Sequence, residues 1–240
     1  MSQRLRLDQA LVQRKLVQTR SEAENWIKLG KVTVNGVVAL RSGVFVGADC
    51  KIALTTKERY VSRAGLKLSS VAKILQLDFT NKTVLDVGSS TGGFTDYALQ
   101  HSAKKVYAVD VGTGQLHLSL QNNKQIELHE KTDIRDFRPT EKPNIVVMDV
   151  SFISLRVILP HIAEICDKDS QVVAMLKPQF EAGKNQVNKG VIKNDAIRRQ
   201  ILKDFEVWVR EYFIITNKAD SRVAGAKGNR ERFYLLQPIV

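Results

Sequence analysis

The chain is poor in cysteine and in long apolar runs, and each shortage excludes a class of protein. Its 240 residues include two cysteines, Cys50 and Cys166, whose positions suit neither a metal site nor a disulfide framework. No apolar run approaches the roughly 20 residues that span a bilayer, and the first residues lack the apolar core of a signal peptide. The four histidines also lack metal-ligand spacing. We therefore expect a cytoplasmic protein with no membrane partner and no metal.

Acidic residues are also scarce relative to basic ones. Lys and Arg number 37 against 25 Asp and Glu, which gives a net charge of +12. Residues 1–60 contain 11 basic residues against 5 acidic ones. A chain this basic is biased toward polyanions such as nucleic acid. A generally basic enzyme without a polyanionic partner is the alternative.

Residues 1–58 have the pattern of a small α+β domain. Apolar residues at helical spacing predict helices within 5–16 and 19–29, and Asn35-Gly36 between β-branched runs predicts a hairpin. Residues 4–52 resemble the RNA-binding module first seen in ribosomal small-subunit protein S-four, through features that lie between Arg4 and Gly36. The resemblance implies RNA-phosphate contacts by a set of basic residues, each of which could instead be a solvated surface charge. This set is Arg4, Arg6, Arg14, Lys15, Arg20, Lys28, Lys31 and, beyond the module, Arg63.

From residue 59 to residue 240 the pattern changes to alternating helices and strands. Apolar runs predict strands at 83–87, 105–110, 125–129, 144–149, 170–176, 212–218 and 231–237. Helical spacing predicts helices near 66–75, 92–100, 154–165 and 195–210. This alternation is typical of an α/β, Rossmann-like domain with a mostly parallel seven-stranded sheet and ligands at the carboxyl ends of the strands.

The most informative stretch, Thr-Val-Leu-Asp-Val-Gly-Ser-Ser-Thr-Gly-Gly-Phe-Thr at 83–95, predicts a strand, a glycine-rich turn and a helix start. Glycine permits positive φ angles and close backbone approach, and the helix N-terminus supplies free N–H donors. The spacing resembles motif I of the S-adenosylmethionine-dependent methyltransferases, not the Gly-x-Gly-x-x-Gly of a dinucleotide site. A different nucleotide-binding turn and a purely structural turn are the alternatives. The candidate cofactor contacts here are Asp86, Gly88, Ser89, Ser90, Thr91, Gly92, Gly93 and Phe94.

Three more aspartates, Asp110, Asp133 and Asp149, end or follow the next strands. Asp110 can accept both hydroxyls of a ribose. The methyltransferase resemblance implies that Asp133 and the following Ile134 contact adenine. Carboxylates disfavour a polyphosphate and favour the sulfonium of S-adenosylmethionine, whose product would be S-adenosylhomocysteine. Any one aspartate could instead be a helix cap or turn former.

Lys67, Asp149, Lys177 and Glu231 match, in order and strand position, the Lys-Asp-Lys-Glu tetrad of FtsJ-type ribose 2′-O-methyltransferases. With the N-terminal module, the chain resembles the TlyA (haemolysin A) family through "YVSRAGLKL", "MDVSFISL", "LKPQFEAGK" and "GNRERF". Ala64 departs from the pattern, where a glycine is expected. The resemblance implies methylation of ribose 2′-hydroxyls in ribosomal RNA, with that RNA or ribosomal subunits as partners. We expect a monomer.

A ribose hydroxyl is a weak nucleophile that must be aligned with the methyl group and then lose its proton. Lys177 is the candidate general base if part of it is neutral, with Lys67 as the neighbouring cation and the carboxylates as orienting groups. In an equally open version Lys177 only steers the hydroxyl, and water takes the proton. The four residues could also form structural ion pairs, and Glu181 competes with Glu231 for its role.

Phe152 and Phe180 could stack on a base or simply pack. The segment 178–194, with Lys184, Lys189 and Lys193, predicts a mobile lid or RNA-binding loop. Two other function classes stay open. One is a ribosome assembly factor without activity, and the other is a membrane-active haemolysin.

Overall fold

The computed structural model describes residues 4–17, 19–28, 30–54, 60–183, 186–187, 190–225 and 228–239. The chain divides into two compact units, unit 1 (Met1–Ser62) and unit 2 (Arg63–Val240). The boundary predicted between residues 58 and 59 falls within segment 55–59, outside the described residues.

Unit 1 combines two packed helices with short antiparallel strands, as its sequence pattern predicts. Its elements are β1 (Leu5–Arg6), α1 (Leu7–Gln13), α2 (Arg20–Lys28), β2 (Val32–Val34), β3 (Val37–Val38), β4 (Phe45–Val46) and β5 (Ile52–Leu54). Strand β2 pairs with β3 and β5, and positive φ angles at Asn35 and Gly36 confirm the hairpin turn. The pairing of β1 with β4 was not predicted, because a two-residue strand has no periodicity.

Asp8 anchors the start of α1 inside unit 1. Its side chain is fully buried and accepts hydrogen bonds from Arg6, from Arg20 at 2.9 Å and from the backbone N–H of Gln9. The hydrogen bond from Arg6 is the largest cause that lowers the pKa of Asp8 to about 2. Two of the candidate RNA-binding arginines are therefore engaged within the unit.

Unit 2 alternates helices and strands in the predicted order. Its elements are α3 (Arg63–Ala72), β6 (Thr83–Val87), α4 (Gly93–Gln100), β7 (Lys105–Val109), β8 (Ile126–His129), the 3-10 helix η1 (Ile134–Asp136), β9 (Ile145–Met148), α5 (Leu155–Ile165), β10 (Gln171–Leu176), α6 (Pro178–Glu181), α7 (Asp195–Trp208), the 3-10 helix η3 (Val209–Glu211), β11 (Phe213–Asp220) and β12 (Arg232–Pro238). The seven predicted strands are confirmed to within two residues at each end.

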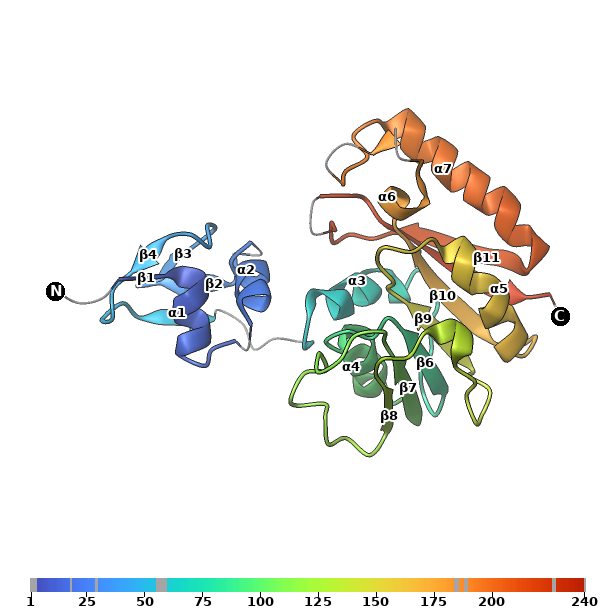
Figure 1. Ribbon diagram of the computed structural model, residues 1–240, viewed down its shortest axis with the longest axis horizontal. Helices are drawn as coiled ribbons and strands as arrows, with labels where there is room; N and C mark the ends of the chain where they lie inside the picture. The colour runs from blue at the N-terminus through green and yellow to red at the C-terminus, as the bar shows by residue number, and fades with distance from the viewer. Residues whose placement is uncertain are drawn as a thin grey trace. The chain divides into compact units, whose positions relative to one another are not determined.

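These strands form one sheet in the order β11-β12-β10-β9-β6-β7-β8. Strands β6 to β10 run parallel to one another, whereas β12 lies antiparallel between β10 and β11. Helices α5 and α7 pack on one face through a continuous apolar cluster that includes Leu159, Phe205 and Tyr234. Helices α3 and α4 pack together on the other face (Figure 1). Since β6, β7 and β9 are parallel neighbours, their carboxyl ends open on the same edge.

Within the described residues, no helix has both the length and the apolar character needed to cross a bilayer.

Asp8→Asn should destabilise unit 1 by about 1–3 kcal/mol at neutral pH, because it removes a charged acceptor of four hydrogen bonds. The folded pKa of Asp8 is lowered to about 2, so this stability is present above the unfolded value near 3.8 and is lost as the pH falls through 2. Denaturant unfolding of full-length Trp208→Phe protein would follow unit 1 through Trp26, which is buried there.

The matched control is Asp49→Asn, which changes an exposed aspartate of the same unit. It should leave the midpoint of the Trp26 transition unchanged. A stability loss in Asp8→Asn that is as large at pH 2 as at pH 7 would contradict the assigned role of the Asp8 charge.

Candidate active site

Two adjoining cavities lie at the carboxyl ends of β6, β7 and β9. The larger cavity has a volume of about 390 Å³ and the smaller cavity about 180 Å³. Gly88, Ser90, Asp149 and Ser151 line both of them. The strand-end aspartates and the predicted lysines therefore converge on one continuous site. Its size is typical of small-molecule pockets.

The turn after β6 has the backbone that its glycines predict. Gly88, Ser90 and Gly92 have φ angles of 77°, 46° and 87°, and α4 begins at Gly93. A Cβ atom on Gly92 would lie 2.6 Å from the Leu120 side chain. The left-handed backbone therefore favours glycine at position 92, and a side chain there would also displace the ends of Leu116 and Leu120. Thr91 and Phe94 also line the smaller cavity.

Asp86 lies under this turn and is 1% exposed. Its Oδ2 accepts from the backbone N–H and the hydroxyl of Thr95, at 2.9 and 2.7 Å. Its Oδ1 is buried with no hydrogen-bond partner among the described residues, as is the hydroxyl of Ser89. Burial raises the pKa of Asp86 to about 7. An acceptor of this kind at the wall of the smaller cavity fits a cationic ligand that donates hydrogen bonds.

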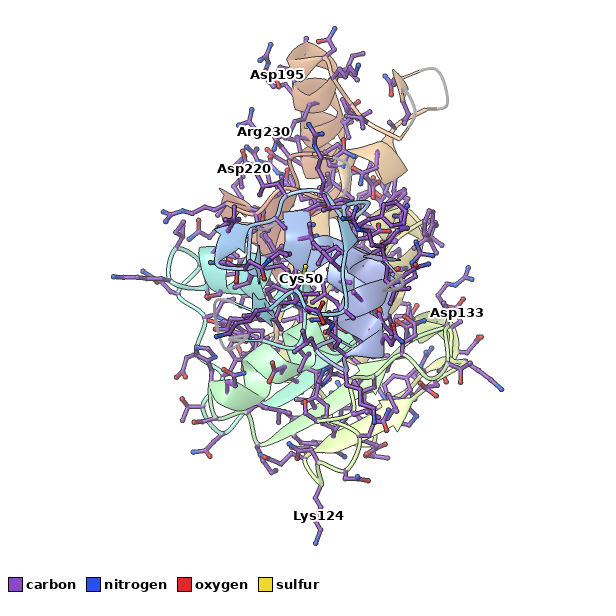
Figure 2. All side chains as sticks on the ribbon, turned by 90° about the vertical axis from the view of Figure 1, so that its left-hand side faces the viewer. Cys50, Lys124, Asp133, Asp195, Asp220 and Arg230 are labelled. Carbon is purple, nitrogen blue, oxygen red and sulfur yellow. The ribbon has the colours of Figure 1, made fainter. Side chains whose placement is uncertain are left out.

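The remaining predicted cofactor residues lie around the larger cavity. Asp110 accepts from the backbone N–H groups of Ser90 and Gly112, at 2.8 and 2.7 Å. Asp133, on the loop after β8 (Figure 2), caps η1 and pairs with Arg135, whose hydrogen bond is the main cause that lowers its pKa to about 2. Ile134 is a buried part of the lining. Asp110, Asp133 and Ile134 thus line the larger cavity, and the two carboxylates accept hydrogen bonds from backbone N–H groups of the surrounding loops.

The four tetrad residues form two ion pairs, of which Lys67–Glu231 is buried and Lys177–Asp149 is partly buried. Lys67 Nζ lies 2.7 Å from a Glu231 oxygen, and Lys177 Nζ lies 2.6 Å from Asp149 Oδ1. These side chains come from α3, the start of β12, and the ends of β10 and β9. Both lysines and Asp149 line the smaller cavity. Two separate pairings therefore place two cations at one small cavity.

Ser151 is a site residue that the sequence analysis missed. Its hydroxyl accepts a hydrogen bond of 2.7 Å from Lys177 Nζ, and it lines both cavities. Its position two residues beyond a strand-end aspartate was the available signal, but serine is common in such turns.

Glu181, the competitor for the role of Glu231, has a different function in the fold. Its carboxylate accepts from the Ser154 hydroxyl and the Leu155 N–H, at 2.6 and 2.7 Å. It therefore binds the N-terminus of α5, where a carboxylate is favoured. Burial raises its pKa above the ordinary value.

An exposed aromatic residue lies at the rim of the larger cavity. Phe152 is 91% exposed and has a φ of 66°, which is unusual for a residue with a side chain. Its ring centroid lies 5.2 Å from that of Phe180, and Lys177 Nζ lies 5.9 Å from the Phe180 ring. The ring of Phe152 is thus presented to solvent beside the site.

The candidate RNA-binding residues differ in their solvent exposure and in whether they already bind other groups of the protein. Arg4, Lys15 and Lys28 are exposed, Lys31 is partly buried, and Arg6 and Arg20 bind Asp8. Arg14 donates to the backbone carbonyls of Gly47, Ala48 and Cys50 and so fixes a loop of unit 1. Arg63, in unit 2, donates to the Ala224 carbonyl at 2.8 Å.

The predicted loop at 178–194 is corrected at its start. Residues 178–181 form α6, because Pro178 occupies the first helical turn, where its missing N–H costs nothing. Lys184 and Lys189 lie outside the described residues, and Lys193 is exposed.

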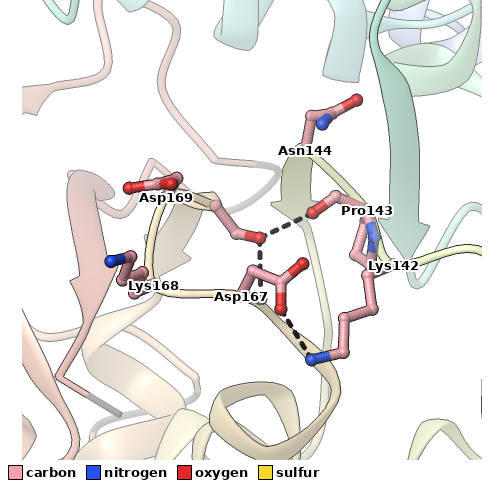
Figure 3. A pocket seen from close by; sticks show the side chains of 7 residues that line it. Lys142, Pro143, Asn144, Asp167, Lys168 and Asp169 are labelled. Carbon is pink, nitrogen blue, oxygen red and sulfur yellow. Dashed lines mark hydrogen bonds and ion pairs between the residues drawn. The ribbon is translucent and has the colours of Figure 1, made fainter.

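Another cavity, of about 480 Å³, lies at the opposite end of the sheet, where β9 and β10 begin (Figure 3). Lys142 pairs there with Asp167 at 2.6 Å, and the Ser170 hydroxyl donates to the Pro143 carbonyl. This cavity contains none of the strand-end carboxylates. In the described ranges, no three His, Cys, Asp or Glu side chains are grouped to hold a metal ion.

Comparisons with known proteins agree with this geometry. The family model for FtsJ-like methyltransferase matches residues 60–237, and the S4 domain model matches residues 5–49. The 23S rRNA (cytidine-2'-O)-methyltransferase TlyA of Campylobacter jejuni is 43% identical over 180 residues, or 74% of this chain and 70% of its own. Hemolysin A of Brachyspira hyodysenteriae is 37% identical over 233 residues, covering 95% and 97%. A solved structure of a hemolysin candidate from Streptococcus thermophilus has a TM-score of 0.78 at 35% identity, covering 99% and 90%.

The mostly parallel sheet, the glycine-rich turn and the cavity at the strand ends define unit 2 as a methyltransferase domain of the Rossmann-like class. The chain belongs to the FtsJ-like methyltransferase family and carries an S4 domain at residues 5–49. The resemblance to the TlyA (haemolysin A) family is confirmed by relatives of both names.

Binding of a cationic ligand beside Asp86 should release protons near pH 7, because the cation lowers a pKa that burial has raised to about 7. Calorimetry in buffers with different ionisation enthalpies measures this release. Asp86→Asn should bind without a buffer-dependent enthalpy. The exposed control Asp78→Asn should behave like the wild type. Equal buffer dependence in wild type and Asp86→Asn would contradict the assignment.

Gly92→Ala should lower the stability of unit 2 by about 2–4 kcal/mol, because the new methyl group meets Leu116 and Leu120 in a left-handed backbone. Gly114→Ala is the matched control, since Gly114 has a φ of 62° and open space around it. It should cost only about 1 kcal/mol. Urea unfolding followed by Trp208 in a Trp26→Phe background measures both. Equal losses would show that the close contact at Gly92 has no energetic effect.

Proposed function

We propose that the protein is an S-adenosylmethionine-dependent methyltransferase that modifies ribose 2′-hydroxyls of ribosomal RNA. The observation that carries the proposal is the convergence of the Lys67–Glu231 and Lys177–Asp149 pairs on the smaller cavity. The relatives named as rRNA (cytidine-2'-O)-methyltransferases support the substrate, and the S4 domain supports contact with RNA.

The site fits the proposed cofactor. The buried Asp86 Oδ1 and Ser89 hydroxyl, without partners in the described residues, would hold its polar amino-acid end. Asp110 and Asp133, with Ile134, would hold the ribose and adenine in the larger cavity. When bound, S-adenosylmethionine supplies an electrophilic methyl group and leaves as S-adenosylhomocysteine.

The lysines would act on the RNA hydroxyl. Lys177 forms an ion pair with Asp149 and donates a hydrogen bond to Ser151, and both contacts fix its amine at the junction of the two cavities. A paired ammonium group has no lone pair with which to take a proton. We therefore assign Lys177 to steering the ribose hydroxyl toward the methyl group, with the proton passing to water. Lys67, held by Glu231, would stabilise the oxygen as it loses that proton.

The exposed Phe152 would stack on a base next to the reacting ribose, since aromatic rings stack on unpaired bases of RNA. The exposed basic residues of unit 1 would bind phosphates and position the RNA. We further propose that the domain boundary lies at residues 58–59, that the chain acts as a monomer, and that it works in the cytoplasm, where ribosomes are made.

Transfer of radiolabelled methyl groups to purified ribosomal subunits tests the proposal. Lys177→Ala should lower the rate by about 100-fold or more, because it removes a positioned charged donor. Lys177→Arg should retain more activity than Lys177→Ala if the residue steers, and no more if it must accept a proton. Lys203→Ala, on the exposed face of α7, should have the wild-type rate.

The label should resist alkali at one internucleotide bond, because a 2′-O-methyl group blocks cleavage there. Cofactor binding without label in any subunit or RNA would overturn the proposal in favour of a ribosome assembly factor.

A further inference from the structure

Glu231 is buried at a point where the chain is held from both sides. It is 2% exposed and lies directly before β12. Its backbone carbonyl accepts from Ser221 N–H at 2.9 Å, and Ser221 follows the end of β11. The orientation of its carboxylate toward Lys67 therefore depends on how residues 230–232 are held.

Arg198 of α7 binds the residue on the amino side of Glu231. The arginine is 8% exposed, and its Nε donates to the Arg230 backbone carbonyl at 3.1 Å. Its Nη2 donates at the same time to Asp220 Oδ1 at 2.9 Å. A planar guanidinium makes these bonds from two nitrogens held at a fixed separation, whereas lysine has one nitrogen on a flexible stem.

Asp220, the last residue of β11, binds the residue on the carboxyl side. Its Oδ1 also accepts from Arg232 Nε at 2.6 Å, and Asp220 and Arg232 are cross-strand partners. Burial by itself would raise the pKa of Asp220, but the hydrogen bonds from Arg232 and Arg198 together lower it. Figure 2 shows Arg230 between Asp220 and Asp195, which lies at the start of α7. The Arg230 guanidinium lies 3.8 Å from an Asp195 oxygen and 3.9 Å from an Asp220 oxygen.

We propose that Arg198 and Asp220 are positioning residues for the methyl-transfer reaction, holding residues 230–232 so that Glu231 meets Lys67. This inference rests on the proposed function for its catalytic readout. The same guanidinium binds both the chain before Glu231 and the carboxylate that holds the chain after it. The cavities are lined by neither residue, so the pair acts through Glu231 and not by touching a ligand.

Methyl-transfer kinetics of Arg198→Lys, which retains the charge but loses the fork, test this inference. We expect kcat to fall at least tenfold while the cofactor affinity changes less than twofold. Asp220→Asn, a second variant of nearly unchanged shape, should fall in the same way. Lys218→Met is the matched control, because it breaks the Lys218–Glu206 bridge of 2.8 Å between β11 and α7 but leaves the 3.9 Å contact of Glu206 with Arg232 in place. Its kcat should stay within twofold of the wild type.

A double-mutant cycle separates positioning from general loss of structure. In a Glu231→Gln background, Arg198→Lys should lower kcat less than twofold, since the interaction that it supports is already gone. An equal fold loss in both backgrounds would overturn the inference, as would an equal loss in Lys218→Met.

Competitive acetylation of Lys67, measured by mass spectrometry, gives a readout that needs no enzymatic activity. Arg198→Lys and Glu231→Gln should each raise the labelling rate of Lys67 at least threefold, and Lys218→Met should not. If wild-type protein transfers no methyl group but this pattern holds, the proposed function fails and the positioning stands. If Lys67 labelling is unchanged in Arg198→Lys, the positioning fails whatever the activity.

Discussion

A buried charge is costly unless a group of opposite charge lies beside it, and this constraint determines the arrangement of the candidate site. Lys67 and Lys177 are 11% and 9% exposed at their side chains, and each meets a carboxylate from a different strand. Removing one member of such a pair leaves an uncompensated buried charge, which costs more than the pair contributes. The pairs therefore fix where α3, β9, β10 and β12 stand relative to one another at the edge of the sheet. The same ion pairs hold the two lysine ammonium groups in fixed positions at the smaller cavity.

The turn after β6 depends on a second constraint, which is space. A methyl group at Gly92 would displace the ends of the Leu116 and Leu120 side chains, and a Cβ atom at Gly88 would lie 3.3 Å from backbone atoms of Asp149 and Val150. Backbone that lies this close to the β9 end forms the wall shared by both cavities. Because no bulky side chain of the turn stands between them, the carboxylates of Asp86, Asp110 and Asp149 can lie close to a small ligand.

Strands β6, β7, β9 and β10 were predictable to within one residue because they are mostly buried apolar runs that end at a charged residue or a turn. The four tetrad residues were predicted from their match, in order and strand position, to the FtsJ-type pattern, and the structure brings them together as two ion pairs. Other features left no trace in the local sequence. Ser151 looks like an ordinary turn serine, and the roles of Arg14 and Arg198 come from partners more than twenty residues away. Asp8 has a distant partner in Arg20 besides its neighbour Arg6. The net charge of residues 1–60 likewise indicated a basic surface, but it could not show that three arginines are engaged within the unit.

The place of β12 in the sheet has a consequence for synthesis. In the part of the chain that the structure describes, β11 pairs with β12 alone, and β12 lies between β10 and β11. During translation the earlier strands emerge first, but β11 has no neighbour until residues 232–238 follow it. Glu231 arrives with that same segment. Lys67 is thus made more than 160 residues before its partner, so the nascent domain holds an unpaired lysine and an open sheet edge until its last strand is inserted.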